Sequence, residues 1–314
     1  MNNASVIQVL NSLPKNEIIY YQPCPGNAGD GLIAAGAFTL FDQIGLNIEV
    51  IKSTNFDSTN KIVIYAGGGN LVGIYSDAKD FISKQHKAAK MFILLPHTVT
   101  NNDELLAELG ENTILFAREM VTYQYLQNHA QHATVYIDHD LAFHLKPEKL
   151  LEIGKTSIIK CALLKIFYKI TKNYTAYKNT PQPAVMNRYS NFESKRLMLD
   201  TKSGNFFRTD VESIFEKIPD NNMDLSNLYE GATTNKDICY FTVGRLMQFI
   251  NKFEIINTDR LHICIAAALL GKKVNFYSNS YFKCKAIYEH SLENAYPNVT
   301  WKGSSLENVF QNAA

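Results

Sequence analysis

Four consecutive residues in the second half of the chain combine anion binding with proton exchange: Asp259, Arg260, Leu261 and His262. They stand between the strand-like segment FEIINT and the apolar run ICIAAALL. An arginine beside a helix N-terminus favours an anion, because the guanidinium and the free N–H groups both donate. A histidine exchanges protons near neutral pH. We therefore expect His262 to be catalytic and the other three to bind substrate, with the Arg260 charge serving a ligand. An internal Asp259–Arg260 pair that only caps the helix is the alternative.

Two glycine-rich turns in the first half are further candidates. The turn PGNAGDG (25–31) and the triple glycine 67–69 each follow a strand-like segment. Glycine lets a ligand approach the backbone closely, and Asp30 could serve as a catalytic acid or base. Alternatively, Asp30 caps a helix and the glycines only shape the turns. The candidate residues of these turns are Gly29, Asp30, Gly68, Gly69 and Asn70.

Three more polar residues follow apolar segments. His97 stands in LPHTV, Arg118 follows TILFA, and Arg208 follows an aromatic pair. Arginine can hold a phosphate or carboxylate through two parallel hydrogen bonds. We expect all three to line a substrate site, with carboxylate-paired arginines and a structural histidine as the alternatives. No metal-ligand spacing is present, so we predict no protein-bound metal.

The apolar segments before these residues alternate with helical stretches. Short runs such as KIVIYAGG (61–68) and KMFILLPHTV (90–99) are typical of buried parallel strands. We predict an α/β protein with two Rossmann-like domains, 1–145 and 191–314, joined by segment 146–190. Ligands in such folds bind at the carboxyl ends of the strands, here in the crevice between the domains.

The joining segment 146–190 carries nine Lys or Arg against two Glu, whereas the whole chain has a net charge of +1. Within it, residues 155–172 predict a basic amphipathic helix that could contact an anionic membrane surface or a lipid-linked acceptor. Alternatively, the apolar face packs on its own domain and leaves the lysines in water. The segment 179–187 predicts a linker, and KRLMLD (195–200) predicts a strand. The expected apolar face is Ile159, Leu163, Ile166 and Ile170, and the expected basic face is Lys165, Lys169 and Lys172.

Composition narrows the class of protein. The 314 residues are 46% hydrophobic, enough for a sizeable core, and 31 Lys and Arg nearly balance 30 Asp and Glu. This balance argues against a general nucleic-acid binder. Five cysteines without a CxxC motif indicate a reducing compartment. With no signal-peptide pattern and no long apolar run, we expect a cytoplasmic protein. The basic helix leaves open a contact with the inner face of the plasma membrane.

The order of the motifs resembles that of a known family. GNAGD, GGGNL, LPHTV, ARE, DHDLAF, TDRLH and LLGKKV occur in the order typical of polysaccharide pyruvyl transferases, over roughly 17–145 and 196–290. The resemblance implies a two-domain fold like that of the B-type glycosyltransferases (GT-B), with the active site in the interdomain cleft. It implies transfer of an enolpyruvyl group from phosphoenolpyruvate to hydroxyls of a sugar in a surface polysaccharide or its lipid-linked precursor. A pyruvate ketal forms and phosphate is released, with no further cofactor.

The resemblance also implies roles for particular residues. The phosphoenolpyruvate site of the family uses the Arg-Leu-His of the last motif, here Arg260 to His262. By motif position, an Asp and a further Arg of the first domain correspond to Asp30 and Arg118. Two features depart from the family: His97 stands where Gln is common, and segment 146–190 has no counterpart.

Two other functions fit the same residues. A GT-B glycosyltransferase would use a nucleotide sugar and would need a pocket for the base and ribose in the second domain. A non-catalytic sugar- or phosphate-binding protein of polysaccharide assembly would bind the ligand without releasing phosphate.

Overall fold

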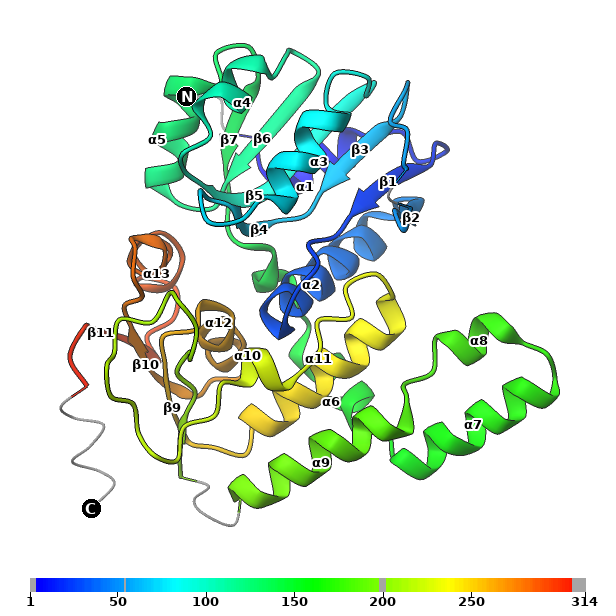
Figure 1. The fold of residues 1–314 in the computed structure, drawn as a ribbon, viewed down its shortest axis with the longest axis vertical. Helices are drawn as coiled ribbons and strands as arrows, with labels where there is room; N and C mark the ends of the chain where they lie inside the picture. Colours follow the sequence, from blue (N-terminus) through cyan, green and yellow to red (C-terminus); the bar gives the residue numbers. More distant parts are fainter. Residues whose placement is uncertain (1–3, 54, 198–201, 307–314) are drawn as a thin grey trace.

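Two parallel β-sheets organise the chain (Figure 1). The structure is a computed structural model that describes residues 4–53, 55–197 and 202–306. One large hydrophobic core cluster includes side chains from both sheets and from the helices packed on them. The predicted α/β class with parallel strands is confirmed.

The first sheet lies in the first half of the chain. Its strands run in the order β2 (Ile48–Val50), β1 (Ile19–Gln22), β3 (Ile62–Tyr65), β5 (Met91–Val99), β6 (Thr113–Ala117) and β7 (Thr134–Ile137). A further short strand, β4 (Gly68–Leu71), pairs with β5, so the predicted glycine turn is in part a strand. All four residues of β3 are buried, as expected for a parallel strand with both faces covered. The accompanying helices are α1 (Val6–Ser12), α2 (Ala28–Ile44), α3 (Asp77–Gln85), α4 (Asp103–Glu108) and α5 (Met120–His129).

The second sheet is smaller. Its strands run in the order β11 (Val299–Gly303), β10 (Lys273–Tyr277), β9 (Ile255–Thr258) and β8 (Ser203–Asn205). Its helices are α10 (Leu225–Leu228), α11 (Lys236–Ile250), α12 (Leu261–Leu269) and α13 (Lys283–Ile287), and a π-helical turn covers Tyr288–Leu292. The strand predicted over 195–200 is wrong in its first part, because 195–197 end a helix; residues 198–200 lie outside the described residues.

Between the sheets the chain is helical. A 3₁₀ turn (Leu141–His144) leads into α6 (Pro147–Gly154), α7 (Ile158–Ile170), α8 (Tyr174–Lys178) and α9 (Pro183–Leu197). The linker predicted over 179–187 is therefore wrong from Pro183 onward, since proline is well suited to a first helical turn, where its missing N–H is not needed. The helix α11 packs against both α6 and α2, which ties the two halves together. The proposed domain boundaries stay predictions.

The face of α7 that packs is the opposite of the expected one. The four residues of the expected apolar face are exposed, whereas Lys165 is buried and donates from Nζ to the Tyr177 carbonyl over 2.8 Å. The alternative, in which the apolar face packs on its own domain, is thus wrong, and Lys165 is no part of a solvated basic face. A helical pattern indicates two faces but not which neighbours they meet.

Candidate active site

A cavity of about 270 Å³ lies where strands of both sheets end. Residues after β1, within β4 and after β6 line it from the first sheet, and residues after β8, β9 and β10 line it from the second. Parallel strands present their carboxyl ends at one edge, which is where ligands bind in such folds. The predicted site residues on its wall are Gly29, Asp30, Gly69, Asn70, Arg118, Arg208, Arg260, Leu261 and His262. Gly68, His97 and Asp259 are not on this wall.

The start of α2 forms one side of the cavity. Asn27 is the N-cap residue and its Oδ1 accepts from the Gly29 N–H over 2.8 Å, while Asp30 Oδ2 accepts from the Asn27 N–H over 3.1 Å. Asp30 therefore caps the helix and also faces the cavity. Burial raises its pKa to about 7, although the Asn27 N–H and the charges of Arg118 and Lys283 act in the opposite direction.

Glycines allow two close contacts at the wall. A Cβ on Gly29 would lie 3.0 Å from His262 Nδ1, and a Cβ on Gly69 would lie 2.7 Å from Arg118 Nη2. Real Cβ atoms tolerate neither distance without displacing a neighbour. The glycines of both turns thus let catalytic candidates approach the backbone.

Arg118, Asp140 and His262 form a buried chain of polar contacts. Arg118 donates from Nη1 to Asp140 Oδ2 over 2.7 Å and from Nε to Thr98 Oγ1 over 2.9 Å. His262 Nε2 lies 3.4 Å from the same Asp140 oxygen. Because a carboxylate only accepts, Nε2 carries the proton and Nδ1 is left on the side of Gly29. Asp140 thereby holds the ring as the carboxylate of a catalytic triad does.

The pKa values of this chain of contacts separate the roles of its members. Burial alone would raise the pKa of Asp140, but the interactions with His262 and Arg118 hold it well below its usual range. Burial lowers the pKa of His262, aided by the charges of Arg118 and Lys283 and opposed by Asp140. His262 is therefore a neutral imidazole near pH 7, ready to accept a proton.

His97 lies outside the cavity wall and contacts β4, which forms part of that wall. It is fully buried, its Nδ1 lies 3.1 Å from the Ala66 carbonyl, and its Nε2 accepts from the Asn70 N–H over 3.2 Å. Burial lowers its pKa to about 3, so the ring is neutral. His97 is a predicted site residue, but it does not face the cavity. It holds β4 in place instead, and Gly68 of β4 lies beside its Cε1 atom.

Arg260 is already paired. Its Nε donates to Asp224 Oδ1 over 3.0 Å and its Nη2 bonds Asp224 Oδ2 and Asp210 Oδ2. The Arg260 side chain is only 7% exposed. The expectation that its charge serves a ligand and not the protein needs correction, because the guanidinium neutralises buried carboxylates as well.

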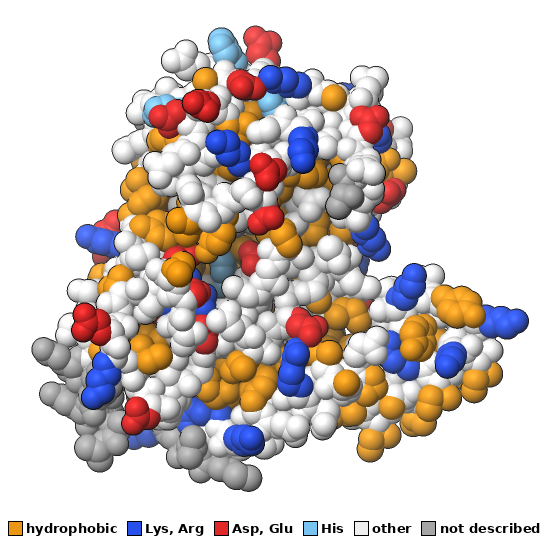
Figure 2. Space-filling view, viewed as in Figure 1, with side chains coloured by type: hydrophobic (Ala, Val, Ile, Leu, Met, Phe, Trp, Pro, Cys, Tyr) orange, Lys and Arg blue, Asp and Glu red, His pale blue; other side chains and the backbone are white. Residues whose placement is uncertain are grey.

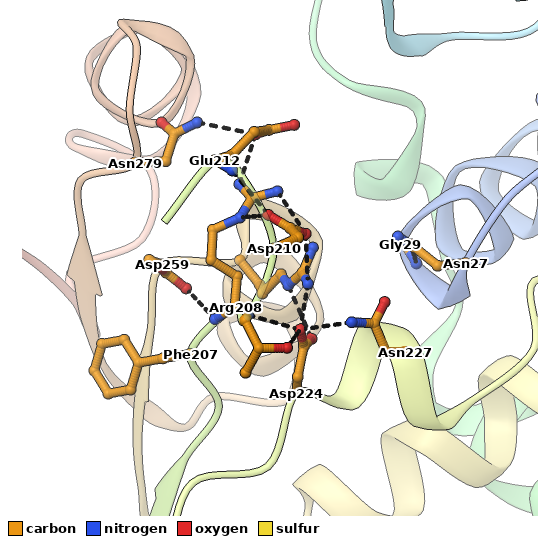
Figure 3. Close-up of polar contacts among 12 residues, drawn as sticks. Asn27, Gly29, Phe207, Arg208, Asp210, Glu212, Asp224, Asn227, Asp259 and Asn279 are labelled. Atoms are coloured by element: carbon orange, nitrogen blue, oxygen red, sulfur yellow. Dashed lines mark hydrogen bonds and ion pairs between the residues drawn. The ribbon is translucent and has the colours of Figure 1, made fainter. Parts of the chain in front are cut away.

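Arg208 and Lys283 belong to the same network, which Figure 3 shows around Arg208. Arg208 bonds Asp210 through Nε over 2.7 Å and Glu212 through Nη1 over 2.6 Å. Glu212 Oε2 also accepts from Lys283 Nζ over 2.8 Å. Burial would raise the pKa values of both carboxyls, but their cationic partners lower each to about 2. Asp210 is the most accessible carboxylate of this network, with 36% of its side chain exposed.

Asp259 lies behind Arg208. Its Oδ1 accepts from the Arg208 backbone N–H over 2.8 Å, as Figure 3 shows, and its Oδ2 has no hydrogen-bond partner among the residues described. Burial raises its pKa to about 7 against the charges of Arg208 and Arg260. It fixes the backbone of the loop that carries Arg208.

Several residues of the site are not among those proposed from the sequence. Lys283 follows the end of β10 and lies on the cavity wall, so it has the same position relative to its strand as the other candidates. Asp140 stands in the motif DHDLAF, and only the structure pairs it with Arg118 and His262. Asp224 and Glu212 lie in a long loop with no periodic pattern, and only the structure pairs them with arginines.

No group of three or more His, Cys, Asp or Glu side chains in the described part of the chain is placed to hold a metal ion. No helix among these residues is long and apolar enough to cross a membrane.

Comparison with known proteins assigns the class. The model of the polysaccharide pyruvyl transferase family matches residues 27–281, so the chain belongs to this family and is a transferase. Over 310 residues it is 24% identical to a Bacillus subtilis (strain 168) protein named "Putative pyruvyl transferase EpsO", covering 93% of this chain and 90% of that one. A crystal structure of the functionally uncharacterized protein KP1_0663 from Klebsiella pneumoniae subsp. pneumoniae NTUH-K2044 superposes with a TM-score of 0.72 at 28% identity. That superposition covers 94% of this chain and 96% of the other.

Proposed function

We propose that this protein transfers an enolpyruvyl group from phosphoenolpyruvate to two hydroxyls of one sugar in a surface polysaccharide or its lipid-linked precursor. The product is a pyruvate ketal, and phosphate is released. One observation carries the proposal: the side chains of Arg118, Arg208, Arg260 and Lys283 converge on one small cavity beside Asp30 and His262. Family membership supports the same chemistry.

The donors in the cavity suit a small molecule with two anionic groups. Phosphoenolpyruvate carries a phosphate and a carboxylate, and each needs several N–H donors. Arg260 is the N-cap residue of α12; its side chain makes no capping hydrogen bond, and its own N–H donates to Thr258 Oγ1 over 3.0 Å. The next N–H groups of α12 have no acceptor within the helix, so together with the Arg118 and Lys283 side chains they can bind an anion. Asp210 is shared between Arg208 and Arg260, and the donor's anionic group replaces it on Arg260.

The pKa values of the two proton-exchanging groups, Asp30 and His262, are shifted in opposite directions. With a pKa raised to about 7, Asp30 is partly protonated at neutral pH and can act as an acid. With a lowered pKa, His262 is neutral and can act as a base. Asp30 gives a proton to the methylene carbon of the donor, which becomes a methyl group and leaves C2 cationic. His262 takes the proton of the attacking hydroxyl.

The atoms balance over the whole reaction. The first sugar hydroxyl bonds to C2, the C2–O bond to phosphate then breaks, and the second hydroxyl bonds to C2. The two hydroxyl protons end on the methyl group and on the released phosphate. No redox step occurs, and phosphoenolpyruvate is the only donor.

The two sheets support a GT-B-like arrangement for this reaction. Each sheet supplies residues that follow its strands, and the cavity takes its wall from both. We infer that two Rossmann-like domains hold donor and acceptor in the cleft between them. No metal takes part in the proposed reaction.

Phosphate release tests the proposal. Purified protein with phosphoenolpyruvate and a panel of free and lipid-linked glycosides should release phosphate. The mass of the acceptor should rise by that of one ketal-linked pyruvyl group. In D₂O, the ketal methyl group should carry one deuterium. Turnover of nucleotide sugars in place of phosphoenolpyruvate would assign a glycosyltransferase. Tight binding of phosphoenolpyruvate with no phosphate release on any acceptor would assign a binding protein.

A further inference from the structure

One helix presents an apolar face that the described part of the protein does not cover. The helix α7 lies with α8 in an arm that extends from the body of the molecule (Figure 1). Five of its side chains, which we name the apolar stripe, are 57–75% exposed. They are Ile159, Leu163, Ile166, Phe167 and Ile170.

The stripe occupies one side of α7. At about 100° per residue, its five side chains fall within about a quarter of the helix circumference. Figure 2 shows hydrophobic side chains gathered along the outer edge of this arm. The helix spans 13 residues, about 20 Å, so the stripe can lie along a surface but cannot cross a bilayer.

The opposite side of α7 fixes this orientation. Cys161 packs in a small core with Met186 of α9 and Phe241 of α11. Lys165 donates to the Tyr177 carbonyl and lies 4.2 Å from the centre of the Tyr177 ring. Because these contacts anchor the inner side, the helix cannot rotate its stripe inward without breaking them.

Lysines border the stripe on both sides. On the helical wheel, Lys160 lies at one edge and Lys169 at the other, and both are exposed. Lys172 follows the helix and is exposed too. The chain has no Asp or Glu between Glu152 and Glu193. The exposed face is therefore apolar along its middle and cationic at its edges, with no acidic residue to offset the charge.

We propose that this face of α7 docks on an anionic lipid bilayer, with the apolar stripe among the upper acyl chains and the lysines at the headgroups. Helices of this pattern lie in the plane of the membrane interface, and lysines near anionic lipid strengthen attachment. A second copy of the chain fits less well, because two stripes packed together would bring the lysine edges together without carboxylates. The proposal goes beyond the transfer reaction and does not depend on it.

Vesicle co-sedimentation tests the docking. We expect wild-type protein to bind phosphatidylcholine vesicles with 30% phosphatidylglycerol at low salt and to bind pure phosphatidylcholine much more weakly. Leu163→Gln/Ile166→Gln/Ile170→Gln should lower the partition coefficient at least about 10-fold. Lys160→Gln/Lys169→Gln should lower it about 30-fold at low salt, at about 1 kcal/mol per lysine. Circular dichroism and the thermal midpoint establish that each variant is folded.

A matched control uses exposed apolar residues elsewhere. Ile7, Ile18 and Val121 are 42–45% exposed on the first half of the chain, and replacing all three by Gln should leave vesicle binding unchanged. A Phe167→Trp variant adds a reporter to the single native Trp301. Its emission should shift to the blue on anionic vesicles and be quenched by brominated acyl chains.

Three outcomes would overturn the proposal. Wild-type protein that stays unbound at low salt shows that the stripe has no lipid affinity. A stripe variant that binds like the wild type places the contact elsewhere. A wild-type dimer that the stripe substitutions convert to monomer, with no vesicle binding, assigns the face to a second copy of the chain. None of these readouts requires turnover, so they do not bear on the proposed reaction.

Discussion

Arg118 and Asp140 form an ion pair that is almost completely buried, with Nη1 and Oδ2 2.7 Å apart and side chains 1% and 0% exposed. The same Asp140 oxygen lies 3.4 Å from His262 Nε2. One carboxylate therefore fixes the arginine that we propose binds substrate and orients the histidine that we propose acts as the base. Losing either partner of a buried pair leaves an uncompensated charge, so we regard Asp140 as a positioning residue for both.

Replacing His262 tests the proposed base. His262→Asn should lower kcat by about 10²–10⁴ with a smaller change in KM for phosphoenolpyruvate, because proton transfer is lost while most anion donors remain. Steady-state phosphate release measures both constants. His139→Asn is the control, since His139 is exposed and bonds Ser291 outside the cavity wall. An unchanged kcat with a raised KM would make His262 a ligand contact only.

The pH dependence tests the proposed acid. The pKa of Asp30 is raised to about 7, so its protonated form is lost as the pH rises through that value. We expect kcat to decline above about pH 7 in the wild type. Asp30→Asn should be slow at every pH and should lack this alkaline limb.

The raised pKa of Asp30 also makes the free energy of unfolding depend on pH. A carboxyl with a raised pKa in the folded state adds stability below its unfolded pKa, and that contribution is lost as the pH rises through about 7. Denaturant titrations at pH 5 and pH 8 should therefore show Asp30→Asn gaining stability relative to the wild type at the higher pH. Asp42→Asn, at the exposed end of the same helix, should show no such difference. Parallel pH profiles for Asp30→Asn and the wild type would contradict the assignment.

Lys283 should bind the donor. Lys283→Met removes a cation from the cavity, and losing one charged contact commonly costs about 2–5 kcal/mol, so KM for phosphoenolpyruvate should rise at least about 30-fold. Lys285→Met is the matched control two residues away, because Lys285 is exposed and pairs with Glu289 at the surface. Equal KM values for the two variants would show that Lys283 serves only to neutralise Glu212.

Arg260 should prove both structural and functional. Arg260→Met leaves Asp224 buried without its guanidinium, and breaking such a pair costs about 3–5 kcal/mol of unfolding free energy. Adding Asp224→Asn removes the unpaired charge and should restore much of the stability but none of the activity. Chemical denaturation and phosphate release separate the two effects. A stable double variant with wild-type turnover would leave Arg260 with a structural role alone.

Most of the site residues proposed from the sequence lie on the cavity wall. Apolar runs predicted the strands, and polar residues directly after them, from Gly29 to His262, meet because parallel strands end at a common edge. This inference needs only the strand boundaries, and the pattern of apolar residues along the chain indicates these well. The same positional argument applies to Lys283, which follows β10 and also lies on the wall.

Only the tertiary structure decided which partners these residues take. Arg260 meets Asp224, 36 residues away, and His262 meets Asp140, 122 residues away, so no local pattern could pair them. The same limit explains α7: its periodicity showed two faces, but the contacts of Lys165 with α8 and of Cys161 with α9 and α11 decided which one is buried. The free energy of a long-range contact depends on elements that lie close only after folding, and local sequence does not contain that information.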